Sequence, residues 1–385
     1  MRPLLLTLAA LLCTAGALAA PLQPRSAAEI VQRLDGDPAS RARERGWQRR
    51  LQQQPRDQQA ALALGQSLLA RARAEGDARL GGRALAALQG FAEAAPPPEV
   101  ALLRARVQQH LHDFEASAQG LQALLRRPAL EAGLRSQAAL LLAAVRRTQG
   151  QLPASEAACA ELPPGWLQQA CQLETRSLRD PALPLAEWAG LRAQVRGDAA
   201  AQAWLWLAEA EQAQRAGLSG PAEAGLRTAL LLQDDLYTRC ALADLLQAQG
   251  RLREALALLE GQARSDAVAV RQAALAQALG DTRAGPWAAE LRARFAQARE
   301  RHAADPREPL PHLREQAQFA LWVERAPRQA LELAQRNTRQ QRESADLLLL
   351  AQAAQAAGQP QALRQAQALT EQIGLHDERL QALAP

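Results

Sequence analysis

Short turns recur along the chain at a nearly constant spacing, and this period restricts the possible folds more than any other feature. Successive turns lie about 30 to 37 residues apart, with one interval of about 45. They fall at Gly76-Asp77, His112-Asp113, Gly150, Asp180, Gly217, Gly250, Gly280, Arg325–Pro327 and Gly358. This period is typical of solenoids built from helix-turn-helix units. One unit cannot cover its own apolar faces, so we expect neighbouring units to stack into a continuous core.

The residues between the turns favour helices. Apolar side chains recur there at helical spacing, as Leu242, Leu245 and Leu246 do. Aromatic residues make up only 3% of the chain and β-branched residues are sparse, so little is available to build strands. An apolar fraction of 48% and a net charge of only +5 argue against disorder. We therefore predict an all-α fold.

The clearest unit runs from Leu236 to Ala263. The residues that carry its pattern are Leu242-Ala243, Leu246, Gly250, Glu254-Ala255 and Leu259. Ala243 and Ala255 are small where two helices would cross closely, and Gly250 suits the left-handed backbone at a helix end. This unit resembles the tetratricopeptide signature in residue type and spacing. Similar units, centred on Gly150, Gly217 and Gly358, extend the resemblance over most of residues 57–373.

The resemblance implies a right-handed superhelical solenoid of about eight tetratricopeptide-like helix pairs. We assign repeats to residues 57–302 and 313–373. Residues 20–56 are expected to form a linker and capping helices, and residues 374–385 a C-terminal tail. Residues 303–312 contain three prolines and cannot be helical throughout, so we expect a loop there.

The whole chain also resembles a group of exported tetratricopeptide proteins of proteobacteria. The passages that carry this likeness are Glu75-Gly76-Asp77, Leu103-Arg104-Ala105-Arg106 leading to His112-Asp113-Phe114, and His312-Leu313-Arg314-Glu315 leading to Phe319-Ala320-Leu321. The resemblance implies the same architecture and a bacterial envelope setting. It implies no particular activity.

The first residues have the pattern of a cleavable export signal. Arg2 precedes the apolar stretch from Pro3 to Leu12, and Ala17-Leu18-Ala19 supplies small residues for signal peptidase. We expect residues 1–19 to be removed by a cut near Ala19, which gives a periplasmic or secreted protein. The apolar stretch is too short to span a bilayer, and no later segment is long and uncharged enough, so no membrane span is predicted.

Three cysteines follow the predicted signal. Cys159 lies on the second helix of one unit and Cys171 on the next helix, so their sulfurs can meet. An oxidising compartment would favour a disulfide between them, worth about 2–3 kcal/mol, and two buried thiols are the alternative. Cys240 is expected to be a buried free thiol.

The sequence carries no signature of common enzyme chemistry. The chain contains no lysine, which excludes a standard phosphate-binding loop and a lysine Schiff base. The nucleotide-binding, serine-hydrolase, zinc-protease and C-x-x-C patterns are also missing. Arginines alternate with acidic residues and lack interleaved aromatics, which argues against nucleic-acid binding. We predict a protein that is not an enzyme and has no cofactor.

The histidines offer an alternative. No two lie at a helical spacing of three or four, so we predict no metal site. His302 and His312 flank the proline-rich loop, however, and could form a metal or catalytic site with Asp305 or Glu308. A cell-envelope polysaccharide accessory is a further alternative, and it would require aromatic side chains exposed in the groove.

In tetratricopeptide solenoids, the first helix of each pair lines a concave groove where partners bind. The resemblance places the following residues in that groove: Arg106, His110, Arg147, Glu209, Gln212, Asp244, Gln247 and Gln352. The groove would be basic toward the N-terminal units and acidic in the middle, which favours an extended or helical peptide with charges of both signs. We therefore predict an exported scaffold that binds a protein or peptide partner. Replacing Glu209 and Asp244 with arginine is expected to weaken that binding.

Overall fold

A computed structural model describes residues 38–93, 95–304 and 312–383. The predicted signal peptide and most of the predicted proline-rich loop lie outside these residues. The chain divides into two units, residues 1–45 and 46–385. Helix α1 (Pro38–Gln53) crosses their boundary, and the description below concerns the second unit.

All regular secondary structure in the described residues is helical. The N-terminal helices are α2 (Gln58–Glu75), α3 (Ala78–Ala87), η1 (Gln89–Phe91), α4 (Pro98–His110), α5 (Phe114–Leu125), α6 (Ala132–Thr148), α7 (Leu152–Ala160), α8 (Trp166–Arg179) and α9 (Ala186–Gln194). The central helices are α10 (Ala199–Arg215), α11 (Ser219–Leu232), α12 (Leu236–Ala248), α13 (Leu252–Leu259), α14 (Asp266–Leu279) and α15 (Ala284–Ala304). The C-terminal helices are α16 (Leu313–Gln318), η2 (Phe319–Val323), α17 (Pro327–Asn337), α18 (Ser344–Ala356), α19 (Pro360–Ile373) and α20 (Glu378–Gln381).

Consecutive helices pack in nine successive pairs across the described ranges, from α2–α3 to α18–α19. Each turn recognised in the sequence lies between the two helices of one pair. Gly250 adopts the left-handed conformation expected there, with φ of 76°. His112 and Arg325 adopt the same conformation without being glycine, with φ of 62° and 54°. The predicted all-α solenoid is confirmed.

Two boundaries differ from the sequence-based assignment. Helix α15 ends at Ala304, two residues beyond the predicted end of the first repeat region. The segment assigned as a C-terminal tail contains α20, and Leu375 and Leu380 on this segment are buried against the C-terminal helices. No helix within the described ranges combines the length and apolarity needed to cross a membrane.

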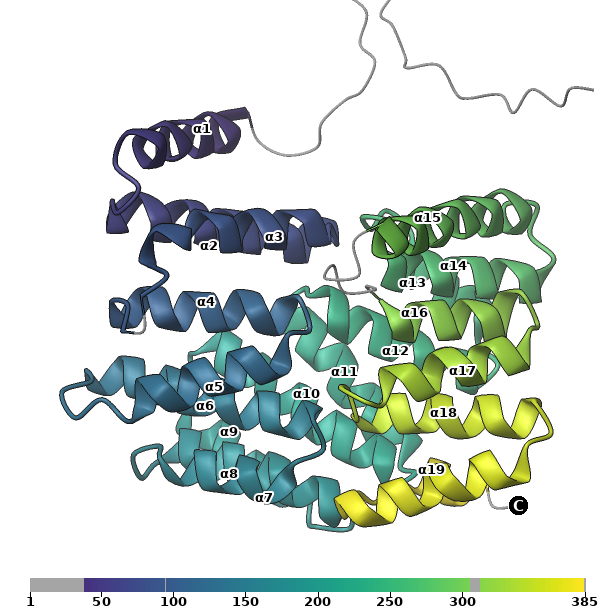
Figure 1. The fold of residues 1–385 in the computed structure, drawn as a ribbon. Coiled ribbons are helices and arrows are strands. Elements are labelled where there is room, and N and C mark those ends of the chain that lie inside the picture. The colour runs from purple at the N-terminus through teal and green to yellow at the C-terminus, as the bar shows by residue number, and fades with distance from the viewer. Residues whose placement is uncertain (1–37, 94, 305–311, 384–385) are drawn as a thin grey trace, which may run out of the picture. The chain divides into compact units, whose positions relative to one another are not determined.

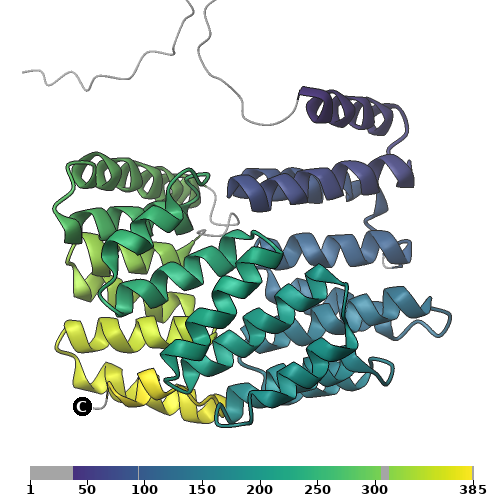
Figure 2. The same cartoon turned by 180° about the vertical axis from the view of Figure 1, so that it is seen from behind.

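The C-terminal helices pack against the turns of the N-terminal pairs. The Arg342 N–H donates to the Thr148 carbonyl at 2.7 Å, and the His376 N–H donates to the Leu178 carbonyl at 2.8 Å. Leu152 of α7 is buried in the same apolar cluster as helices α17 to α19. We call the whole line of contact between helices α2–α8 and α14–α20 the seam. Figures 1 and 2 show these two groups of helices on opposite sides of the unit, connected by α10 to α13, which lie at the back in Figure 1 and in front in Figure 2.

The structure contains a disulfide between Cys159 of α7 and Cys171 of α8, with a Cα–Cα distance of 5.6 Å. This distance lies within the usual range for disulfides. Cys240 is free and buried.

Replacing Cys159 and Cys171 together by alanine is expected to lower the free energy of unfolding by about 3 kcal/mol, because the bridge closes a short loop in the unfolded chain. Urea denaturation measures the change, and Cys240→Ala serves as the control for removal of a buried sulfur. Reduction of the wild-type protein should have the same effect as the double replacement. Equal stability of oxidised and reduced protein would contradict a bridge in solution.

Candidate functional site: the central cavity

The solenoid surrounds a cavity of about 1130 Å³. The first helix of every pair, from α2 to α18, contributes at least one side chain to its wall. These side chains are mostly polar or small, whereas the opposite faces of the same helices carry the leucines of the core. The cavity is therefore built by the repeat itself, since the first helix of each pair adds one row of inward-facing side chains.

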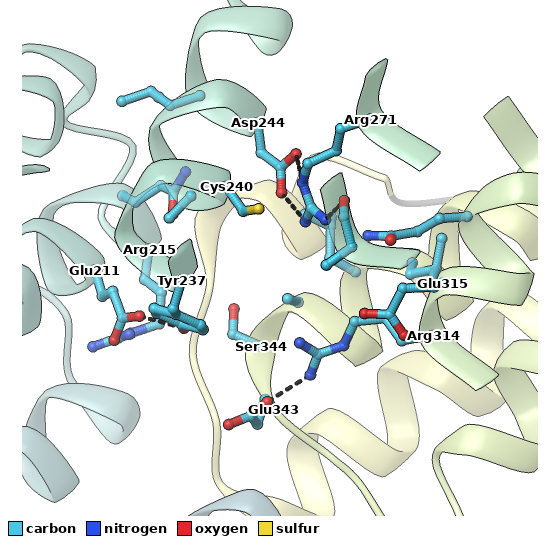
Figure 3. Close-up of a pocket in the computed structure, with 18 of the residues that line it drawn as sticks. Glu211, Arg215, Tyr237, Cys240, Asp244, Arg271, Arg314, Glu315, Glu343 and Ser344 are labelled. Carbon is cyan, nitrogen blue, oxygen red and sulfur yellow. Dashed lines mark hydrogen bonds and ion pairs between the residues drawn. The ribbon is translucent and has the colours of Figure 1, made fainter. Parts of the chain in front are cut away.

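Part of the wall is held by a buried ion pair between α12 and α14. Arg271 donates Nε and Nη2 to the two carboxylate oxygens of Asp244, at 2.7 and 2.6 Å. Burial alone would lower the pKa of Arg271, but the charge of Asp244 outweighs it and raises that pKa above its ordinary value. Both carboxylate oxygens of Asp244 therefore accept from Arg271, and this ion pair links the first helices of two neighbouring pairs (Figure 3).

A second ion-pair network lies between α16 and α18. Arg314 binds both carboxylate oxygens of Asp346, at 2.6 and 2.7 Å, and also donates to Glu343 at 2.5 Å. Asn337 of α17 donates its side-chain amide to Asp346 at 2.7 Å. Both carboxylate oxygens of Asp346 therefore accept hydrogen bonds within the network, which fixes the C-terminal part of the wall.

Tyr237, the only tyrosine in the chain, projects into the cavity. It is 55% exposed, although it belongs to an inward-facing helix. Its hydroxyl donates to Glu211 at 2.5 Å. The charge of Glu211 raises the pKa of Tyr237 above its ordinary value, so the phenol stays protonated. Figure 3 shows Glu211, Arg215 and Tyr237 together on one side of the pocket.

Two arginines of the cavity wall have polar atoms that the described residues leave without a hydrogen bond. Arg215 is 5% exposed, and Nη2 donates to Ser177 at 2.9 Å while Nε has no partner. Arg147 pairs with Glu174 at 2.7 Å through Nη2, and its buried Nη1 has no partner. A buried donor without an acceptor costs about 1–3 kcal/mol, so a bound acceptor would be favoured here.

The wall near α2 and α4 is basic. Arg73 lines the cavity and has no carboxylate partner among the described residues. Arg106 lies outside the wall and donates to the Gln137 amide oxygen at 2.7 Å. Burial lowers the pKa of both guanidinium groups, and for Arg73 the charge of Arg106 adds to the effect. Burial and the nearby Arg73 lower the pKa of His110 to about 4, so this histidine is neutral at pH 7.

Five of the predicted groove residues line the cavity, namely His110, Arg147, Asp244, Gln247 and Gln352. Arg106, Glu209 and Gln212 do not. Gln212 is completely buried, where it accepts from the Trp188 indole N–H at 2.6 Å and donates to the Pro181 and Leu183 carbonyls. Its amide holds the core together and is not available to a partner.

Glu209 is likewise occupied elsewhere, because it pairs with Arg192, whose guanidinium stacks on the Trp206 ring at 3.6 Å. Helix α10 presents Glu211, Gln214 and Arg215 to the cavity instead. Counting back from the turn would have found this register, since Glu211 lies six residues before Gly217, as Asp244 does before Gly250. Tyr237 and Arg314 carry no comparable signal in the repeat pattern.

The described ranges contain no group of three or more histidine, cysteine, aspartate or glutamate side chains arranged to hold a metal ion. Of the residues in the alternative metal site, Asp305 and Glu308 lie outside the described residues. His302 belongs to α15, and His312 lies immediately before α16.

No protein-family model and no curated protein matches this chain. Among solved structures, the APC/C hetero-tetramer Cut9–Hcn1 resembles it with a TM-score of 0.36 and 12% identity, over 86% of this chain and 84% of that one. The TPR domain of P58(IPK) resembles it with a TM-score of 0.24 and 16% identity, over 84% of this chain and 97% of that one. Both likenesses are distant.

Proposed function

We propose that this chain is an exported scaffold, without chemistry of its own, that holds a segment of a partner protein in its central cavity. The observation that carries the proposal is the cavity wall, to which the first helix of every pair contributes. Small-molecule pockets usually measure about 300–1,000 Å³, so a cavity of about 1130 Å³ has room for several residues of a peptide.

The wall also indicates which chemistry the peptide carries. Asp244 and Arg314 already have charged partners within the protein, so they stabilise the cavity wall and do not bind the peptide. Arg73 and the free Nε of Arg215 remain available for carbonyl or carboxylate oxygens, and Tyr237 offers an aromatic face. The partner segment thus places acidic or carbonyl groups toward α2 and α10 and an apolar side chain beside Tyr237.

Two features support an extracytoplasmic location. The first 19 residues have the pattern of an export signal, and the fold contains the Cys159–Cys171 disulfide. Disulfides persist in oxidising compartments such as the periplasm and are rare in the cytosol. Exposure of this fold to such a compartment would keep the bridge closed.

Replacing Tyr237 by alanine is expected to weaken partner binding about thirtyfold, the effect of losing a central aromatic anchor worth about 2 kcal/mol. The measurement is crosslinked co-purification of the tagged mature protein from its host envelope, followed by titration of the captured partner. The Glu209 and Asp244 charge reversal is unsuitable, because Asp244→Arg would leave Arg271 buried beside a like charge.

The matched control is Leu231→Ala, which removes an apolar side chain that is 88% exposed and is not part of the cavity wall. It should bind as the wild type does. Equal binding by the Tyr237 and Leu231 variants would rule out the cavity as the binding site. Failure of the wild type to retain any partner would argue against the scaffold itself.

A further inference from the structure

Two histidines face each other across the seam at the edge of the cavity. His112 lies in the turn between α4 and α5, and His312 lies immediately before α16. Their ring centroids are 6.4 Å apart, and both residues line the cavity. We call this pair the histidine contact.

We propose that the solenoid opens at the histidine contact when its imidazoles become protonated, which widens the central cavity in mildly acidic conditions. This goes beyond the proposed function, because it concerns the protein without a partner.

The two rings are held in place from their own elements. His112 and His312 both have left-handed backbones, with φ of 62° and 60°, and each stands at a helix boundary. The His112 ring also stacks on Phe114, with centroids 5.4 Å apart. The two imidazoles therefore meet where the α4–α5 turn and the start of α16 come together, and moving these two elements apart would separate the rings.

Farther along the seam, hydrogen bonds join its two sides. They link Arg342 to Thr148, Thr148 to Glu343, and His376 to Leu178. Leu152 is also buried among the C-terminal helices there. This region can act as a hinge while the histidine contact separates.

The charges around the histidine contact disfavour further positive charge. His110 and Arg73 lie nearby on α4 and α2, and Arg314 lies on α16. Asp113, the neighbour of His112, accepts the Ala116 N–H as the cap of α5. Of the remaining carboxylates, Glu343 already binds Arg314.

Glu315 and Glu343 are the carboxylates whose charge favours a protonated His112, and Glu315 Oε2 lies 3.9 Å from His312 Nδ1. Burial alone would raise its pKa, but His312 and Arg314 outweigh burial and lower that pKa, so Glu315 is already ionised at neutral pH. Acidification cannot recruit another negative charge, and like charges therefore accumulate across the seam.

The sign of the pH effect follows from burial. In the closed state, burial lowers the pKa of His112, and burial with Arg73 lowers that of His110 to about 4. An open state that exposes them would restore values near 6.5. The open state then binds more protons, so closure is fully favoured above about pH 6.5 and weakens as the pH falls toward 4.

Hydrogen exchange of the mature protein alone, at pH 7.5 and pH 5.0, tests the proposal. After correction for the intrinsic pH dependence of exchange, amides in residues 107–118 and 312–320 are expected to exchange about tenfold faster at pH 5.0, the effect of one pKa unit of linkage. Amides in residues 344–351, beside the hinge region, should exchange equally at both values.

The double variant His112→Asn with His312→Asn removes both imidazoles and keeps side chains that tolerate left-handed backbone. It is expected to reduce the acid response, because His110 remains, while His376→Asn, which changes a histidine outside the cavity wall, keeps the full response. Circular dichroism confirms that each variant is folded, and His110→Gln, which should reduce the response, replaces the double variant if that fails. An acid response that is missing in the wild type, or unchanged without these histidines, would overturn the proposal. Neither result depends on the partner.

Discussion

Replacing Asp346 by alanine is expected to lower the free energy of unfolding by about 3–5 kcal/mol, the usual cost of leaving a buried charge without its partner. Asp346 is 1% exposed. Its two oxygens bind Arg314, and it also accepts the Asn337 amide and the Glu343 backbone N–H. After the replacement, Arg314 retains only Glu343, and the cap of α18 is lost as well.

Urea denaturation measures this loss. The matched control is Glu371→Ala on the neighbouring helix α19, an exposed carboxylate that should change stability by less than about 0.5 kcal/mol. The paired replacement Arg314→Met with Asp346→Leu should be less destabilising than Asp346→Ala alone, because no charge is then left unpaired. A loss below about 1 kcal/mol for Asp346→Ala would mean that Glu343 or water compensates Arg314.

Replacing Trp188 by alanine is expected to cost about 3–5 kcal/mol, as removal of a large buried aromatic side chain usually does. Trp188 is fully buried between α8, α9 and α10. Its indole N–H donates to Gln212, which in turn binds the Pro181 and Leu183 carbonyls. The replacement leaves a cavity and also removes a donor from this network.

Trp188→Phe separates the two contributions. Phenylalanine retains most of the apolar burial but leaves the Gln212 oxygen without its donor, so a loss of about 1–3 kcal/mol is expected. Because Gln212 adjoins Glu211, hydrogen exchange should also show faster opening of α10 in the alanine variant. If the phenylalanine and wild-type proteins denature at the same urea concentration, the indole hydrogen bond contributes nothing.

The repeat architecture was predictable because its signals are local. Gly217 and Gly250 end helices in left-handed backbone, and leucines at helical spacing fill the core between neighbouring pairs. Even His112, a turn without glycine, falls at the expected interval. Each of these signals depends on a few adjacent residues, so a single sequence reveals them.

The inward-facing residues were predictable only where the register was clear. On α12, where the match to the repeat is strong, the assigned positions Asp244 and Gln247 line the cavity. On α10 the assigned positions were Glu209 and Gln212, and both are occupied by structural contacts. The Leu207-Ala208 pair of α10 lies two residues farther from its turn glycine than Leu242-Ala243 does, so aligning the helices on these pairs shifts the register of α10 by two residues.

The sequence by itself determined that this chain forms stacked helix pairs, because adjacent residues encode each helix, each turn and each contact between neighbouring pairs. Only the tertiary structure decided that the stack returns on itself and encloses a cavity. Thr148 and Glu343 meet across 195 residues of sequence, and the histidine contact joins two turns that have no pattern in common. The stack closes because every helix pair is rotated slightly relative to the one before it. No local sequence pattern reveals the total of these rotations.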